Sequence, residues 1–458
     1  MKKRKLLVLG LVIAMIAGMT VGCGDGGESA EGEDSVATEE DVAEGEEGKV
    51  YYLNFKPEQA EQWEAIAAQY TEETGVEVKV KTAAAGEYEK TLKSEISKKD
   101  APTLFQINGP VGYQAWKDYT ADLKDTDLYS WLKDKDMAVT DGEGVYGIPY
   151  VVEGFGIIYN EEIMDKYFAL DGAKATSMDE MKNFDSLKVV VEDMQARKDE
   201  LGIQGVFAST SFAPGEDWRW QTHLMNLPVY YEYQEDGVTD KAELEFRYAD
   251  QFKNIFDLYI NNSVTEPAML GAKSVNDSMA EFALGNAAMV QNGNWGLGQV
   301  SGVDGNVVKE DKVKFLPIYT GVEGEEAQGL CIGTENFYSI NKQASSADQV
   351  ASIEFVEWVF GSDTGKALAT SELGFISPFT TFGSDENPSD PLAQEIVKSM
   401  DNTELKSVSW NFTSFPSQEF KNQFGANLLQ YCTGDMEWDT VVSGVVESWK
   451  YEKEATAE

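Results

Sequence analysis

Short apolar runs alternate with amphipathic helical patterns along the chain from residue 50 onward. The run 50–55 predicts a strand, the region 58–73 has apolar residues at the i, i+3, i+4, i+7 spacing of a helix, and residues 76–80 alternate apolar and charged positions as a strand does. A second helical pattern over 88–96 leads to a further strand at 103–107. Strands that alternate with helices predict a parallel sheet with right-handed crossovers, and therefore an α/β fold.

The loops that follow two of these strands combine polar groups with aromatic residues. The first loop contains Lys56, and the second contains Gln106 and Asn108, followed by Tyr113 and Trp116. Ligands of parallel sheets bind beyond the carboxyl ends of the strands. We therefore expect Lys56, Gln106 and Asn108 to contact a ligand, whereas Trp116 fits packing of a helix face equally well.

The segment 146–166, YGIPYVVEGFGIIYNEEIMDK, organises the rest of the chain. Its first half is apolar and β-branched, with glycines and a proline as punctuation, and it ends at a Tyr-Asn step. The acidic pair Glu161 and Glu162 then suits the positive end of a helix dipole. The pattern predicts an extended segment, a turn and a helix.

This segment resembles the signature of the bacterial extracellular solute-binding proteins of the maltose-binding-like family, which feed ATP-driven (ABC) importers. Tyr150 departs from the family pattern, which prefers an aliphatic residue there. The matching positions are Pro149, Val151, Gly156, Ile157, Ile158, Tyr159, Asn160, Met164 and Lys166. The resemblance implies a two-lobed periplasmic-binding-protein-like fold of type II, with the ligand cleft between lobes joined by several hinge strands. In that family the chain first crosses between the lobes here, beside the cleft, so Glu153 is a candidate ligand residue. The alternative is a buried strand of another α/β fold.

The region 277–298, DSMAEFALGNAAMVQNGNWGLG, is similar to a second hallmark of the family. There a helix runs into a short strand and a turn, which here carries Asn294 and Trp295, and we expect both in the cleft. Further crossings fit near 261–267 and 315–320. The resulting domain prediction has a first lobe of residues 50–150 and 265–318 and a second lobe of residues 151–264 and 319–458.

Two aromatic stretches supply further candidates. Trp218 and Trp220 are two residues apart and cannot share a helix face, so one packs inward and the other is available to the cleft. A later loop presents Trp410 and Asn411. His223 is the only histidine in the chain, and because no second His or Cys is near it in sequence, we expect a structural role for it.

The first 49 residues predict export and anchoring. A basic start is followed by the apolar run 6–19, which is shorter than a membrane span and typical of a secretory signal, residues 1–22. Gly22-Cys23 resembles a lipoprotein processing site, which implies lipidation of Cys23; an ordinary signal peptide with a free cysteine is the alternative. Residues 23–49 are acidic and rich in Gly, Ser and Ala, which predicts a disordered tether.

Charge and cysteine content exclude several classes of protein. The chain has 37 basic and 80 acidic side chains, and its net charge of -43 argues against electrostatic binding of nucleic acid or anionic lipid. Three cysteines in 458 residues do not form a disulfide framework, and Cys331 and Cys432 either pair or remain free thiols.

The candidate residues favour a neutral carbohydrate, specifically an oligosaccharide. Flat aromatic rings bind the apolar faces of sugars while amides and carboxylates bind their hydroxyls, and arginines that would recognise an anion are scarce. We therefore predict a monomeric protein, lipid-anchored at the extracellular face of the cell membrane. It would bind its ligand by hinge closure and deliver it to an ABC permease, with no catalytic residue, cofactor or metal.

Two other functions fit parts of the sequence. One keeps the fold and binds a peptide or another small solute. The other is a secreted glycoside hydrolase, but acidic pairs arise by chance among 80 carboxylates, and no G-x-S-x-G or H-E-x-x-H motif is present.

Overall fold

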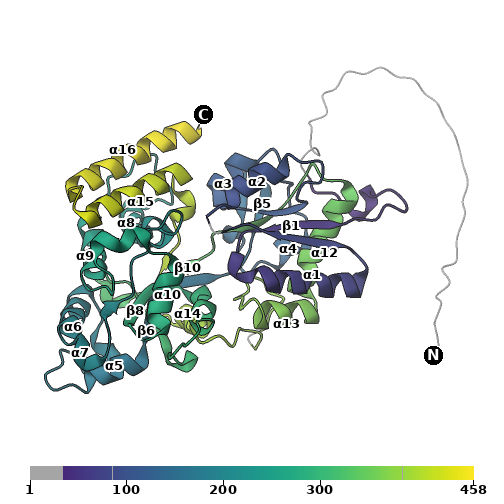
Figure 1. Cartoon of the computed structure of the whole chain (residues 1–458). Coiled ribbons are helices and arrows are strands. Elements are labelled where there is room, and N and C mark those ends of the chain that lie inside the picture. The colour runs from purple at the N-terminus through teal and green to yellow at the C-terminus, as the bar shows by residue number, and fades with distance from the viewer. Residues whose placement is uncertain (1–34, 85, 384, 458) are drawn as a thin grey trace, which may run out of the picture. The chain divides into compact units, whose positions relative to one another are not determined.

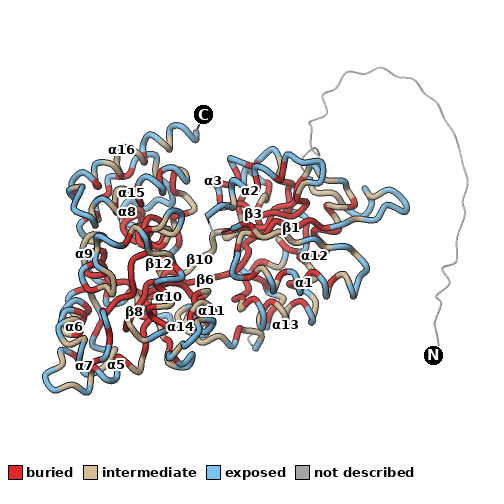
Figure 2. Tube along the Cα trace, in the orientation of Figure 1, coloured by how far each residue is buried: buried red, intermediate tan, exposed pale blue. Residues whose placement is uncertain are grey.

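The computed structural model describes residues 35–84, 86–383 and 385–457 (Figure 1). The predicted signal peptide and Cys23 lie outside the described residues. Within the described part, the strands form two sheets of six strands each, and each sheet is covered by helices, as the predicted α/β class requires. Buried residues concentrate in the strands of both sheets (Figure 2).

The first sheet has the strand order β2-β1-β3-β11-β5-β4. β1 pairs in parallel with β2 and β3, which confirms the parallel start predicted from the sequence, whereas β11 runs antiparallel to β3 and β5. Its strands are β1 (Val50–Asn54), β2 (Val78–Thr82), β3 (Leu104–Ile107), β4 (Val139–Asp141), β5 (Gly144–Pro149) and β11 (Phe337–Ile340). Its helices are η2 (Pro57–Gln59), α1 (Ala60–Thr74), α2 (Tyr88–Ile96), α3 (Gly109–Trp116), α4 (Asp127–Trp131), η3 (Lys135–Met137), α12 (Ser346–Gly361) and α13 (Asp363–Ser371).

The second sheet has the order β12-β10-β6-β8-β7, with β9 also paired to β6. Its strands are β6 (Glu153–Asn160), β7 (Gly205–Phe207), β8 (Ala287–Gly293), β9 (Val313–Leu316), β10 (Gln328–Gly333) and β12 (Lys406–Ser409). The α-helices of this half are α5 (Glu161–Phe168), α6 (Phe184–Ala196), α7 (Lys198–Leu201), α8 (Asn226–Asp236), α9 (Ala249–Asn261), α10 (Val275–Ala283), α11 (Leu297–Ser301), α14 (Pro391–Asp401), α15 (Gln418–Thr433) and α16 (Trp438–Ala457). Short 3-10 turns are η4 (Met178–Glu180), η6 (Pro267–Ala272), η7 (Asn294–Gly296), η8 (Glu310–Lys312), η9 (Glu325–Ala327) and η10 (Phe412–Ser414), and η5 (Arg219–Leu224) is a π-helix.

Local sequence signals set several of these elements. Helix α1 buries the face predicted for it, formed by Trp63, Ile66, Ala67 and Tyr70. It ends at Gly75, whose φ of 85° suits a residue without a Cβ. Helix α5 begins where Asn160 accepts a hydrogen bond from the backbone of Glu162, so the Tyr-Asn step is an N-cap.

Three connections join the two lobes, which are defined here by the two sheets and their helices. The first runs from β5 to β6 through residues 149–153, as predicted. The second runs from β10 to β11 through residues 333–337, and the third runs from α13 to α14, with an antiparallel bridge between Val152 and Ile376.

The two later crossings predicted near 261–267 and 315–320 are wrong. Strands β7, β8 and β9 all belong to the second sheet, so residues 265–318 lie in the second lobe. Strand β11 and helix α12, which the prediction gave to the second lobe, belong to the first. A strand's own sequence carries little information on which sheet it joins, because pairing is decided by partners distant in the chain.

Part of the predicted tether is ordered against the first lobe. The backbone of Val36 donates to Asp122 O at 3.1 Å, and the backbone of Ala37 donates to Gln349 Oε1 at 3.1 Å. The 3-10 turn η1 (Glu39–Asp41) carries a capping box with Thr38. Residues 35–49 therefore depart from the predicted disorder, because Val36 packs against the core and the backbone finds specific acceptors.

The structure also describes two of the cysteines and the length of the helices. Cys331 and Cys432 are both free thiols. None of the helices in the described ranges combines the length and apolar character needed to span a bilayer.

Candidate functional site

A buried ion pair lies where the chain leaves the first lobe. Lys56, in the loop after β1, pairs with Glu153 at the start of β6, and their side chains are only 5% and 7% exposed. The Lys56 ammonium lies 5.6 Å from the ring centre of Phe55, 5.7 Å from that of Tyr150 and 5.5 Å from that of Trp295. Burial raises the pKa of the Glu153 carboxyl, and the Lys56 ammonium opposes that rise. The ammonium thus has three ring contacts and a carboxylate around it.

The second lobe contributes a group of rings that we call the aromatic cluster: Phe155, Trp218, His223, Trp295, Trp410 and Phe412. Trp295 lies 6.3 Å from Trp218 and 6.4 Å from Trp410, between ring centres. Trp218 and Trp295 are half-buried, and Trp410 is buried. Because Trp295 also contacts the Lys56 ammonium, the cluster and the ion pair form one continuous site.

Two glycines and one amide position the tryptophans. A Cβ at Gly293 would lie 2.1 Å from the Trp295 ring, and one at Gly333 would lie 2.5 Å from Trp410, so both rings pack directly on backbone. Asn294 Oδ1 accepts a hydrogen bond from Gly154 N at 2.9 Å, which fixes η7 to strand β6. Gly333 is also the ladder partner of Glu153, so Trp410 lies beside the ion pair.

Several buried polar atoms around the site have no hydrogen-bond partner among the described residues. They include Gln106 Nε2, Thr334 Oγ1 and Trp410 Nε1, and also Nε and Nη1 of Arg219, whose guanidinium lies 5.4 Å from the ring centre of Trp218. Gln106 is fully buried, and its Oε1 accepts from Phe55 N at 3.2 Å, next to Lys56. Thr334 directly follows the glycine on which Trp410 packs. A buried polar atom left unpaired costs free energy, so such a concentration marks a place where a polar ligand would be stabilising.

Asn108 and Asn411, which we expected from the sequence to contact a ligand, lie next to a second contact between the two lobes. A Cβ at Gly109, which has φ of 61°, would lie 2.7 Å from the Thr413 Cβ, so α3 meets η10 closely. Asn108 precedes Gly109 and is half-buried, with no side-chain hydrogen bond to another described residue. Asn411 precedes η10, and its backbone donates to Asn226 Oδ1 at 2.6 Å.

Trp220 does not lie with the other candidates. It is 3% exposed, its Nε1 donates to Ser211 O at 3.1 Å, and it packs against Phe256 and Tyr259 in the core of the second lobe. The structure thus directs Trp218 into the aromatic cluster and Trp220 into the core. We leave Trp220 out of the candidate site.

Three charged or ionisable residues near the site were not among the sequence candidates. The first, His223, is in ring contact with the five other members of the aromatic cluster. Burial, together with Glu153, raises the pKa of Glu335 to about 7, and burial lowers the pKa of Lys421 on α15. Glu335 sits in the connection between β10 and β11, and Lys421 affects its pKa from the second lobe. A lysine on a helix and a glutamate in a turn carry no sequence signal of this proximity.

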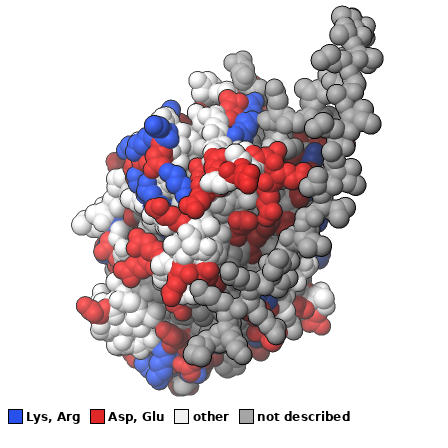
Figure 3. Space-filling view, turned by 90° about the vertical axis from the view of Figure 1, so that its right-hand side faces the viewer, with Lys and Arg blue, Asp and Glu red and all other residues white. Residues whose placement is uncertain are grey.

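One face of the molecule carries mainly acidic charge. In Figure 3, the Asp and Glu side chains cover a larger part of this face than the Lys and Arg side chains do.

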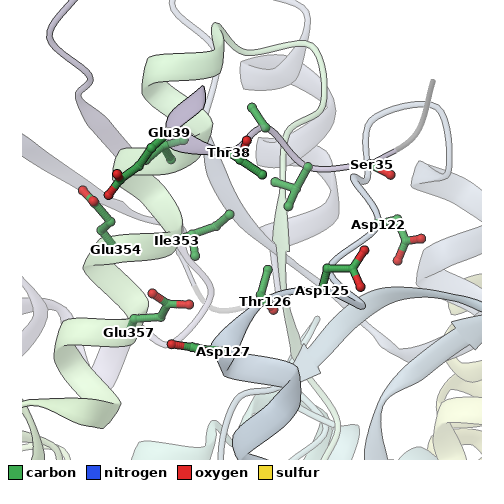
Figure 4. A pocket seen from close by; sticks show the side chains of 13 residues that line it. Ser35, Thr38, Glu39, Asp122, Asp125, Thr126, Asp127, Ile353, Glu354 and Glu357 are labelled. Carbon is green, nitrogen blue, oxygen red and sulfur yellow. The ribbon is translucent and has the colours of Figure 1, made fainter. Parts of the chain in front are cut away.

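A cavity of about 330 Å³ in the first lobe lies apart from the aromatic cluster. It is lined by Ser35, Val36, Ala37, Thr38, Glu39, Asp122, Asp125, Thr126, Asp127, Val350, Ile353, Glu354 and Glu357 (Figure 4). It contains no aromatic side chain, and no group of three or more His, Cys, Asp or Glu in the described ranges could hold a metal ion.

A comparison with family models identifies the family of this chain. Residues 65–395, more than half of the chain, match the family model described as bacterial extracellular solute-binding protein. No curated protein matches the chain.

Solved structures of low sequence identity share the fold. One is RafE in complex with raffinose, with a TM-score of 0.64 and 16% identity over 88% of this chain and 99% of that chain. A chitin oligosaccharide binding protein has a TM-score of 0.69 and 17% identity over 90% of this chain and 100% of that one. The GacH receptor of Streptomyces glaucescens GLA.O, determined unliganded and with acarbose, has a TM-score of 0.61 and 17% identity over 89% of this chain and 99% of that one.

Proposed function

Because the chain belongs to the bacterial extracellular solute-binding proteins, whose fold has two lobes of type II, we propose that it captures a neutral oligosaccharide and delivers it to an ABC permease. The family and fold are those of substrate-binding proteins rather than enzymes. The observation that carries the choice of ligand is the aromatic cluster beside unpaired polar atoms.

The rings of the cluster suit the apolar faces of pyranose sugars. Trp218 and Trp295 keep part of their surface exposed, and their ring planes are inclined by 51° to each other. Two inclined tryptophan faces can contact consecutive sugar units whose planes differ, which favours an oligosaccharide over a single sugar. Raffinose, chitin oligosaccharides and acarbose, bound by the structurally similar proteins, are compatible with such a surface.

The polar atoms of the site suit hydroxyl groups. Gln106 Nε2 and Trp410 Nε1 are donors, and Thr334 Oγ1 both donates and accepts. Lys56 is already neutralised by Glu153, so the pair offers both a donor and an acceptor without a net charge. The pair therefore leaves no unpaired cation at Lys56 to recognise an anion, and this part of the site favours a neutral ligand.

The side chains of the candidate site belong to both lobes, which supports binding by hinge closure. Lys56 and Gln106 belong to the first lobe, Trp295 and Trp410 belong to the second, and Glu153 lies at the first connection between them. A ligand that contacts both sets would be bound more tightly when the lobes are together, so it would shift the population toward the closed form. We propose that the permease recognises this ligand-bound form.

A thermal-shift and calorimetry panel tests this proposal. The full chain would be titrated with raffinose, chitin oligosaccharides and acarbose, and with monosaccharides, amino acids and short peptides as the comparison set. A ligand at 100 times its dissociation constant stabilises the folded state by about 2.7 kcal/mol, a shift of a few degrees. We expect a response to an oligosaccharide without product formation. A response only to peptides or amino acids would keep the fold and overturn the ligand, and released products would indicate a hydrolase.

Membrane attachment needs a separate test. We propose that Cys23 is lipidated and holds a monomer at the extracellular face of the membrane. The variant Cys23→Ser should move the protein from the membrane fraction of the bacterial cell to the soluble fraction, whereas Cys331→Ser, a buried thiol of the second sheet, should leave it membrane-bound. Equal fractionation of the two variants contradicts lipid anchoring through Cys23.

A further inference from the structure

The single histidine lies at the centre of the aromatic cluster. His223 is 4% exposed and stacks on Phe155, with ring centres 4.5 Å apart and planes inclined by 9°. Its other ring contacts are with Trp218 at 5.1 Å, Trp295 at 5.4 Å, Phe412 at 5.3 Å and Trp410 at 6.0 Å. It therefore touches all three tryptophans assigned to the candidate site.

A π-helical turn produces this position. Residues Arg219–Leu224 form η5, in which Met225 N donates to Trp220 O, five residues earlier. In an α-helix residues 218 and 223 would lie on different faces, but the wider π-turn brings residues five apart onto the same side. Trp218 and His223 consequently contact each other through their side chains. π-turns are rare and frequently occur at functional sites.

The imidazole makes no side-chain hydrogen bond to another described residue, and its nitrogens are not among the buried polar atoms that lack a partner, so they keep contact with solvent. Its neighbours in the cluster are rings, which fix its plane and accept no hydrogen bond from its nitrogens in the plane of the ring. Both nitrogens are therefore available to hydrogen-bond water or a ligand, which phenylalanine at this position could not do. The adjacent Trp410 Nε1 is a buried donor without a partner.

We propose that His223 is a specificity-determining ligand residue whose imidazole hydrogen-bonds a hydroxyl of the sugar unit lying against Trp218 and Trp295. This inference rests on the proposed carbohydrate-binding function. Burial, followed by the charges of Arg219, Lys421 and Lys56, lowers the pKa of His223 to about 3. The ring is thus neutral at physiological pH and offers one donor and one acceptor, the pair that a hydroxyl group complements.

Two variants separate hydrogen bonding from packing. His223→Phe keeps a flat ring on Phe155 and removes both nitrogens, and His223→Gln restores a donor and an acceptor without the ring. Trp220→Phe is the matched control, because it changes an aromatic of the same π-turn that points into the core. For whichever of raffinose, chitin oligosaccharide or acarbose binds the wild type, we expect His223→Phe to lower affinity about 5- to 100-fold. His223→Gln should recover part of that loss, and Trp220→Phe should bind as the wild type does.

Nitrogen NMR of the imidazole gives a readout that packing alone would not move. Because the chain contains one histidine, a sample labelled with ¹⁵N-histidine and carrying no histidine tag gives signals from only two imidazole nitrogens, those of His223. We expect its shifts to stay constant from pH 5 to pH 8 and to change when the sugar is added. Unchanged shifts in the wild-type complex, or unchanged affinity of a folded His223→Phe, would overturn the role of His223 while leaving sugar binding intact. Absence of binding to every sugar would instead overturn the proposed function and this inference with it.

Discussion

The two lobes contribute different chemistry to the candidate site. The first lobe supplies polar groups at the carboxyl ends of parallel strands, namely Gln106 on β3 and Lys56 and Asn108 in the loops after β1 and β3. The second lobe supplies flat rings held by a π-turn, a 3-10 turn and a loop, namely Trp218, Trp295 and Trp410. Polar groups discriminate between hydroxyl arrangements, whereas rings contribute contact area to any sugar face. We infer that the polar groups of the first lobe, together with His223 of the second, mainly determine selectivity and that the tryptophans of the second lobe mainly determine affinity.

The largest effect is expected from breaking the charged part of the first lobe. Lys56→Met leaves the Glu153 carboxylate buried without its partner, so the unfolding free energy at pH 7 should fall by about 3 to 5 kcal/mol. The double variant with Glu153→Leu removes both charges and should recover most of that loss. Urea denaturation of the three proteins measures this, and a single variant as stable as the wild type would show that the pair is not a coupled unit.

The next effect concerns the rings of the second lobe. Trp295→Ala removes the ring that contacts Lys56, Trp218 and Trp410, and should weaken oligosaccharide binding by about 1 to 4 kcal/mol with the fold intact. Trp358→Ala, a half-buried tryptophan on α12 that packs on Tyr70, serves as the control and should leave affinity unchanged. Calorimetric titration decides, and equal affinities for wild type and Trp295→Ala would place Trp295 outside the ligand site.

A pH-dependent effect is expected at the connection between the lobes. The pKa of Glu335 is about 7 in the folded protein, against an ordinary value of 4.5, mainly because of burial. The stabilising proton is fully present below pH 4.5 and is lost as the pH rises through 7. The wild type should therefore lose unfolding free energy between pH 5 and pH 8, whereas Glu335→Gln has no carboxyl to deprotonate at this position. The unfolding free energy of Glu335→Gln minus that of the wild type should be about 1 to 3 kcal/mol more favourable at pH 8 than at pH 5. Thermal unfolding at both pH values measures this difference, and a pH-independent difference contradicts it.

The smallest effect tests selectivity in the first lobe. Asn108→Ala removes an amide without a side-chain hydrogen bond in the described structure, so stability should not change. Affinity for the cognate oligosaccharide should fall by about 0.5 to 1.5 kcal/mol, the value of one hydrogen bond. Gln114→Ala, an exposed amide on α3, is the control. If both variants bind equally well across the sugar panel, Asn108 has no part in selectivity.

Sequence patterns predicted the individual helices and strands of this fold better than they predicted which sheet each strand joins. The buried face of α1, the parallel pairing of β1 with β2 and β3, and the crossing from β5 to β6 are all present. The assignment of β8, β9 and β11 to lobes was wrong, since those strands pair with segments far away in the chain. The same limit applies to the site: Trp295 was found from a motif, whereas Glu335 and Lys421 come near it only through the fold.

The sequence by itself determined the two-lobed α/β architecture, the family and the residue types available for a ligand. These depend on periodicity, turns and motifs, which are local properties. Only the tertiary structure decided that Trp218 joins the cluster while Trp220 enters the core, and that a lone histidine lies among three tryptophans. The physical reason is the wider turn of the π-helix at Arg219–Leu224, which contacts the second sheet through a hydrogen bond from Gln291 Nε2 on β8 to Arg219 O at 2.8 Å and cannot be recognised in the pattern of apolar and polar positions.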